Sequence, residues 1–145
     1  MEVQESPAAF DRPFFEGIAE EPAAVIRTAR RGVPGHLVRD AITILGDHPD
    51  FRLLFVNLLE TTSGNLHRAY QRPALSRTQS EEVLDLLGLI NYAQRVFGDR
   101  EMALEWLRTP VTALAGETPV ALCDTFHGRQ LVRGALRAIE CGEFS

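Results

Sequence analysis

The sequence predicts an all-α fold, in which a helix-turn-helix-like helical bundle is followed by a small helical domain. Apolar residues recur at helical spacing in successive segments, which begin at proline or a capping residue and mostly end at glycine. No stretch alternates apolar and polar residues as a half-buried strand does. The chain has 145 residues, of which 45% are hydrophobic, and this suits one domain or two small subdomains that share a core.

The first 21 residues predict an acidic arm. They include Pro7 and Pro13 and show no clear apolar period. We expect residues 1–21 to be flexible or loosely docked, because chain ends are often poorly ordered. Phe10, Phe14 and Phe15 form an aromatic cluster that could pack on the body of the protein or on a partner.

Residues 22–76 predict a domain of short helices. Prolines that suit a first helical turn and glycines that suit a helix end bound most of these helices. We expect helices at residues 22–31, 34–45, 49–59 and 63–72.

The third predicted domain, residues 77–145, begins with a long helix. Ser76 and Gln79 form a capping box before it, and Gly98 suits its left-handed end. Its apolar residues cover more than one face, so the helix is either central to the core or shared with another subunit. We therefore predict a homodimer with part of the segment 84–96 at or near the shared surface.

Three further helical segments complete the prediction. Asp99 caps a helix that runs to Leu107, and Thr118 with Pro119 starts a short helical turn. Asp124 or Thr125 caps the last helix, which ends at Gly142.

The charge is unevenly distributed along the chain. The net charge of −5 disfavours a general nucleic-acid binder, but residues 25–77 carry eight arginines against four acids. This basic middle indicates either an anionic partner or a solvated arginine-rich surface. We expect a cytoplasmic protein with two reduced cysteines, because no signal peptide, membrane span, metal spacing or catalytic motif is evident. We predict no cofactor and no enzymatic activity.

Specific motifs occur between Arg95 and Gly142. They read VFGDREMALEWLRTP, then ALAGETPVAL, then DTFHGRQLVRGALRAIECGEF. This order resembles the toxin-binding domain of Xre/MbcA/ParS antitoxins. Ala115 stands where that family has a glycine, and Arg137 is one residue earlier than the usual arginine.

The resemblance implies a function as an antitoxin. Its expected partner is a RES-domain toxin, an enzyme that acts on NAD by ADP-ribosyl transfer or NAD breakdown. We expect the antitoxin to block the active site of this toxin and, as a homodimer, to form a hetero-oligomer with it. The candidate toxin-binding residues are Arg129, Val132, Arg133, Leu136, Arg137, Glu140, Glu143, Phe144 and Ser145.

The end of the sequence suggests how the toxin would be blocked. After Gly142 we expect a short mobile tail that carries carboxylates and Phe144. Carboxylates could replace the charge of a pyrophosphate, while the phenyl ring could fill an apolar slot. The alternative is a frayed terminus without a role.

The resemblance also implies a helix-turn-helix in residues 50–72. Its second helix would carry side chains suited to base edges and phosphates, namely Asn65, His67, Arg68, Gln71 and Arg72. Gly64 and Asn65 replace the family's usual Arg-Thr pair. Repression of its own operon is thus a further expectation, and the alternatives are a stand-alone transcription regulator or a merely solvated helix face.

Overall fold

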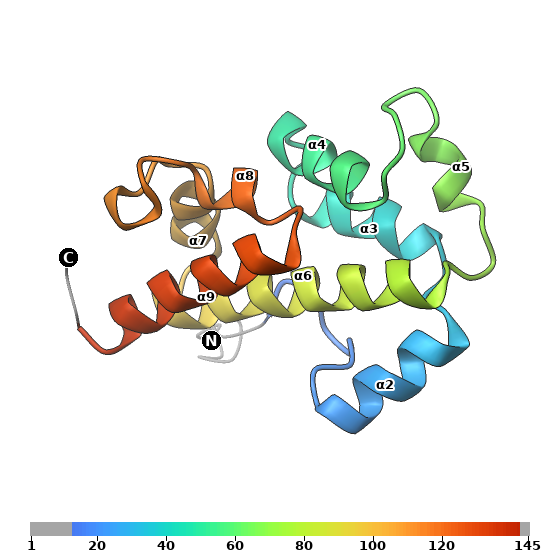
Figure 1. Ribbon diagram of the computed structural model, residues 1–145, viewed down its shortest axis with the longest axis horizontal. Helices are drawn as coiled ribbons and strands as arrows, with labels where there is room; N and C mark the ends of the chain where they lie inside the picture. Colours follow the sequence, from blue (N-terminus) through green and yellow to red (C-terminus); the bar gives the residue numbers. More distant parts are fainter. Residues whose placement is uncertain (1–12, 143–145) are drawn as a thin grey trace, which may run out of the picture.

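The computed structural model describes residues 13–142, and these form a helical bundle with no strand among them (Figure 1). The all-α prediction is confirmed. The elements are α2 (Pro22–Arg31), α3 (His36–Ile44), α4 (Pro49–Leu58), α5 (Leu66–Tyr70), α6 (Arg77–Phe97), α7 (Arg100–Leu107), the 3-10 turn η1 (Thr112–Leu114), α8 (Pro119–Leu122) and α9 (Phe126–Glu140). Within the described residues, no helix is long and apolar enough to cross a bilayer.

Proline, capping residues and glycine determine several helix ends as the sequence predicts. Pro22 and Pro49 are the first residues of α2 and α4. At the start of α6, the Gln79 backbone N–H donates to Ser76 Oγ at 3.1 Å, and the Ser76 N–H donates to Gln79 Oε1 at 3.2 Å. Gly98 ends α6 with φ 70°, a left-handed conformation that favours glycine.

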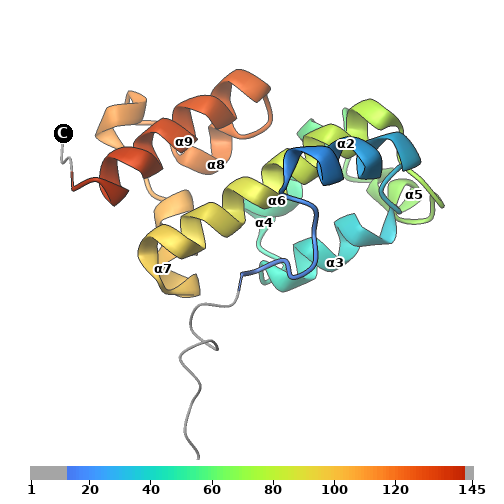
Figure 2. The ribbon, with the colours of Figure 1, turned by 90° about the horizontal axis from the view of Figure 1, so that it is seen from below.

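Helix α6 is the axis of the bundle. Helices α2, α4, α7 and α9 pack around it (Figures 1 and 2). Its apolar residues Val83, Leu84, Leu86, Leu87, Leu89, Ile90 and Ala93 are no more than 3% exposed. The interpretation of this helix as central to the core is confirmed. Because one chain buries these residues, they no longer argue for a homodimer, which stays a prediction.

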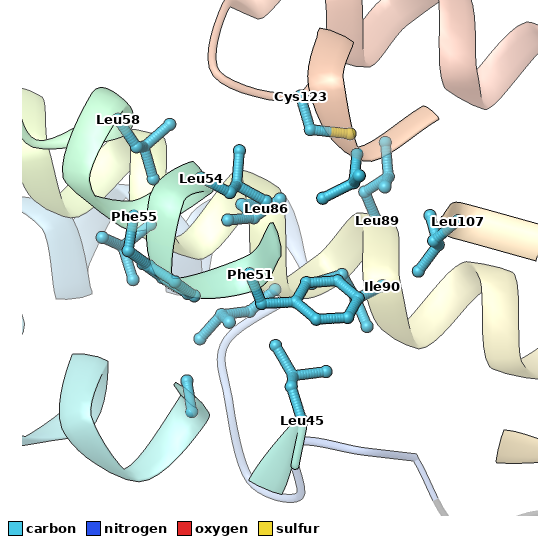
Figure 3. Packing of buried hydrophobic residues seen from close by; sticks show 14 of the residues in the cluster. Leu45, Phe51, Leu54, Phe55, Leu58, Leu86, Leu89, Ile90, Leu107 and Cys123 are labelled. Carbon is cyan, nitrogen blue, oxygen red and sulfur yellow. The ribbon is translucent and has the colours of Figure 1, made fainter. Parts of the chain in front are cut away.

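One hydrophobic core joins the two halves of the chain. Phe51 and Phe55 of α4 lie against Leu86 and Ile90 of α6, with Cys123 nearby (Figure 3). The cluster extends from the N-terminal segment to α9. The proposed boundary at residue 76 stays a prediction, although α6 does begin at the next residue.

The described part of the predicted arm is docked on the body. Phe14 and Phe15 are only 4% exposed, so these two rings pack on the body, which is one of the two positions expected for the aromatic cluster. The flexibility of the arm stays a prediction. Phe15 exchanges two hydrogen bonds with the buried side chain of Asn91, at 3.0 and 3.1 Å. Arg100 lies 5.1 Å from the centre of the Phe14 ring. Phe10 lies outside the described residues.

The predicted helix at residues 63–72 is too long, because the structure has only the five residues of α5. No side chain caps its start, and glycine at position 64 disfavours an earlier beginning. At its end, the carbonyl of Arg72 accepts a hydrogen bond from Gly35 N–H at 2.9 Å. α5 packs on α3, which itself begins at His36 instead of Pro34.

Candidate functional site

The candidate site is α9, whose position is fixed first at its N-terminus. Thr125, and not Asp124, caps the helix, since its hydroxyl accepts from Gly128 N–H at 2.9 Å. A Cβ atom added at Gly128 would lie 1.7 Å from the carbonyl oxygen of Leu122. Only glycine therefore allows α9 to pass this close to α8.

A buried arginine joins α9 to α6. Arg129 is 1% exposed, and its guanidinium donates to Asp85 at 2.6 Å and to Glu82 at 2.6 Å. Its third contact is the carbonyl oxygen of Cys123, at 2.9 Å. Two carboxylates and a carbonyl thus satisfy a charge that would otherwise be very unfavourable inside the protein.

Arg133, one turn further along α9, extends this network. Its guanidinium lies 2.9 Å from the carboxylate of Asp85. Burial alone would raise the pKa of Asp85, but hydrogen bonds from Arg133 and Arg129 outweigh it and hold that pKa below its ordinary value. The ionised carboxylate therefore stabilises the fold at neutral pH, and this contribution is lost as the pH falls through the lowered pKa.

The C-terminal end of α9 is held by a second set of contacts. The Tyr92 hydroxyl donates to Glu140 Oε1 at 2.8 Å. Burial and this hydrogen bond raise the pKa of Tyr92, so the hydroxyl remains a donor at neutral pH. Arg95 lies 5.7 Å from the centre of the Tyr92 ring and 3.6 Å from Glu20. Both ends of α9 are thus attached to α6.

The predicted toxin-binding residues separate into three groups. Arg129, Val132 and Leu136 are at most 1% exposed, so they hold α9 in place and offer no surface to a partner. Arg133, Arg137 and Glu140 reach the surface in part or fully. The remaining three, Glu143, Phe144 and Ser145, lie outside the described residues.

The outer face of α9 carries two residues that the sequence interpretation missed. Leu131 is absent from the predicted toxin-binding residues, and it is 49% exposed. The sequence does contain a pattern that could have identified Leu131 as exposed. Gly128, Val132 and Leu136 recur every four residues and mark the buried face of the helix, and Leu131 lies to one side of that face. Gly134 is exposed as well, and no described atom lies within 4 Å of the place where its Cβ would be.

The predicted DNA-contacting residues do not share one helix. His67 and Arg68 are exposed on α5, whereas Asn65 precedes it and Gln71 follows it. Arg72 also lies beyond α5 and donates to Gln79 Oε1 at 2.8 Å, next to the start of α6. A recognition helix of only five residues presents few side chains to the major groove of DNA. DNA binding stays a prediction.

The two cysteines are unpaired. Cys123 is buried in the core, and this burial raises the pKa of its thiol to about 12. The thiol therefore stays protonated and unreactive. Cys141 is exposed at the end of α9.

Comparison with known proteins identifies relatives of this chain. Residues 93–142 match a family described as the antitoxin Xre/MbcA/ParS C-terminal toxin-binding domain. The match begins in the last turns of α6 and ends just after α9. A protein from Sphingobium sp. (strain YBL2), named Prs ADP-ribosylating antitoxin, is 32% identical over 134 residues, covering 86% of this chain and 82% of that protein.

Proposed function

The chain belongs to the Xre/MbcA/ParS family of antitoxins, and from this premise we propose that it neutralises a RES-domain toxin that uses NAD. The toxin docks on the outer face of α9, and the docked domain covers the active site of the toxin. The antitoxin itself contributes binding and no catalysis. The name of the Sphingobium relative supports a partner whose chemistry is ADP-ribosylation.

The observation that carries the docking site is the pairing of Leu131 with Gly134 on an exposed helix face. A glycine inside a helix costs about 0.5–1 kcal/mol relative to alanine. Nothing among the described residues needs the space beside Gly134. Because Gly134 has no side chain, a partner can approach the helix closely at this position. The half-exposed Leu131 beside it then provides an apolar contact.

The charged residues around this face suit a toxin that binds a phosphate-containing substrate. Arg137 and Glu140 are exposed near the end of α9. A toxin that binds the pyrophosphate of NAD needs positive groups, and carboxylates near the end of α9, such as that of Glu140, can occupy them. The contribution of Glu143 and Phe144 to this blockage is proposed from the sequence alone.

Substitution at Gly134 tests the docking face. We expect Gly134→Ala to raise the melting temperature of the free protein slightly, because alanine favours the helix. Gly134→Arg should weaken toxin binding by at least about tenfold, or about 1.4 kcal/mol, because its side chain would prevent close approach. Calorimetric titration of the toxin with each variant measures the affinity, and circular dichroism measures the melting temperature.

A matched control is available at Gly64, which is exposed and also has no described atom near its Cβ position. Gly64→Arg adds the same side chain far from α9 and should leave toxin affinity unchanged. If Gly134→Arg binds the toxin as tightly as the parent chain does, the outer face of α9 is not the docking site.

A further inference from the structure

The two ends of α9 are attached to α6 by contacts of different kinds. Near the start of α9, the buried Arg129 is bound by carboxylates of α6 inside the protein. At the end of α9, the exposed carboxylate of Glu140 accepts a hydrogen bond from the Tyr92 hydroxyl at 2.8 Å. The two helices lie along each other, so this second contact forms where α9 ends (Figure 1). A single hydrogen bond between exposed groups adds little net stability, because water can replace either partner.

The position of Glu140 is unfavourable for the helix that carries it. Glu140 is the last residue of α9. The C-terminal end of a helix is the negative end of its dipole, where cations are favoured and carboxylates are not. The stability of α9 therefore does not explain a glutamate at this position, and a contact with a partner does.

The ring of Tyr92 has little freedom to move. It packs against the hydrophobic core. On its face, the guanidinium of Arg95 lies 5.7 Å from the ring centre, and Arg95 is itself 3.6 Å from Glu20, in the segment before α2. A fixed ring places the hydroxyl at a defined point beside the last turn of α9.

The hydrogen bond orders a side chain that would otherwise be flexible. An exposed glutamate samples many rotamers, and a partner that fixes it must offset the lost entropy. Tyr92 contacts only Oε1 of Glu140. Within residues 13–142, the other oxygen, Oε2, has no hydrogen bond or ion pair. Glu140 is thus held in one orientation while one of its carboxylate oxygens is available to a partner.

We propose that Tyr92 is a positioning residue for toxin binding, whose hydroxyl fixes Glu140 so that its second carboxylate oxygen meets a positive group of the toxin. This inference rests on the proposed docking of a toxin on α9, and it adds a residue of α6 to that site. Tyr92 acts through Glu140 and lies just before the span, residues 93–142, that matches the toxin-binding family. Its effect on affinity comes from ordering Glu140 before the toxin arrives.

Removal of a single hydroxyl tests this role. Tyr92→Phe keeps the ring, its packing and the contact with Arg95. We expect it to raise the Kd for the purified toxin about three- to tenfold, as measured by surface plasmon resonance with the full chain. The urea midpoint of the free protein should change little. Tyr70→Phe is the matched control at the only other tyrosine, which is half-buried at the end of α5, and it should leave the affinity unchanged.

Two substitutions of Glu140 separate its charge from its position. Glu140→Asp keeps the charge, but its shorter side chain no longer reaches the hydroxyl of Tyr92. It should raise the Kd as much as Tyr92→Phe does, and the two changes together should cause no further loss, because both remove the same contact. Glu140→Gln keeps an acceptor for Tyr92 and lacks the charge, so it should raise the Kd more than tenfold.

Three results would overturn the proposal. These are a Tyr92→Phe variant that binds the toxin like the parent chain, a Glu140→Gln variant that does so, and losses from Tyr92→Phe and Glu140→Asp that add in full. The same measurement on Leu131→Asp identifies which inference has failed. If Leu131→Asp weakens binding and Tyr92→Phe does not, the docking face stands and only the role of Tyr92 is wrong. If neither weakens binding, the proposed docking face is wrong as well.

Discussion

Replacing both acidic partners of the buried arginine, by Glu82→Gln and Asp85→Asn together, is expected to cost about 3–5 kcal/mol of the free energy of unfolding. The amides keep the shape of the carboxylates but remove both charges. Arg129 would remain almost completely buried with its charge uncompensated. Since a domain of this size is stable by about 5–15 kcal/mol, this loss is large.

Arg129→Met should cost less, about 1–3 kcal/mol. It removes the buried charge and leaves an apolar side chain in the core. The two carboxylates that lose their partner are 30% and 31% exposed, so water can solvate them in part. Asp85 also keeps its ion pair with Arg133. Replacing the two acids should therefore lower the free energy of unfolding more than replacing Arg129 does.

Urea unfolding of these variants measures the difference. Arg137→Met, on the exposed side of the same helix, is the control and should change the stability by no more than about 0.5 kcal/mol. If the double amide variant is as stable as Arg129→Met or more so, compensation of the buried charge does not hold α9 on α6.

The second large effect is expected at Leu131. Leu131→Asp should weaken toxin binding by about 2 kcal/mol or more, which is about thirtyfold in Kd, because a charge replaces an apolar contact at the centre of the proposed interface. The side chain is half exposed in the free protein, so folding should be little affected. Calorimetric titration against the toxin gives the affinity.

Leu53 of α4 provides a control of the same residue type and similar exposure. It is 54% exposed and lies outside the span matched by the toxin-binding family. Leu53→Asp should bind the toxin like the parent chain. Equal weakening by the two substitutions would mean that the outer face of α9 has no particular role.

The sequence predicts the helices well because their ends depend on local chemistry. The prolines at the starts of α2 and α4, the capping box before α6 and the left-handed glycine after it act within a few residues. The start of α5 is harder to predict from the sequence, because no side chain caps the first turn of this helix. Its prediction accordingly failed at both ends.

The candidate site was less predictable because it depends on contacts distant in the sequence. Arg129 was expected at a surface that contacts a partner, yet it is buried. Its guanidinium pairs with Asp85 and Glu82 of α6, which lie 44 and 47 residues earlier in the chain. Apolar residues on more than one face of α6 suggested contact with a second subunit. In the structure these faces are covered by α2, α4, α7 and α9 of the same chain. Periodicity identifies apolar helix faces, but it does not say which element covers each one.

In the proposed mechanism, this antitoxin stops an NAD-using toxin by covering its active site. The most direct test measures the initial rate of NAD consumption by the purified partner toxin while the antitoxin is titrated at several NAD concentrations. We predict that turnover stops when the toxin is saturated, and that more antitoxin is needed as NAD increases. A saturated complex that still consumes NAD, or inhibition that is independent of the NAD concentration, would contradict this mechanism.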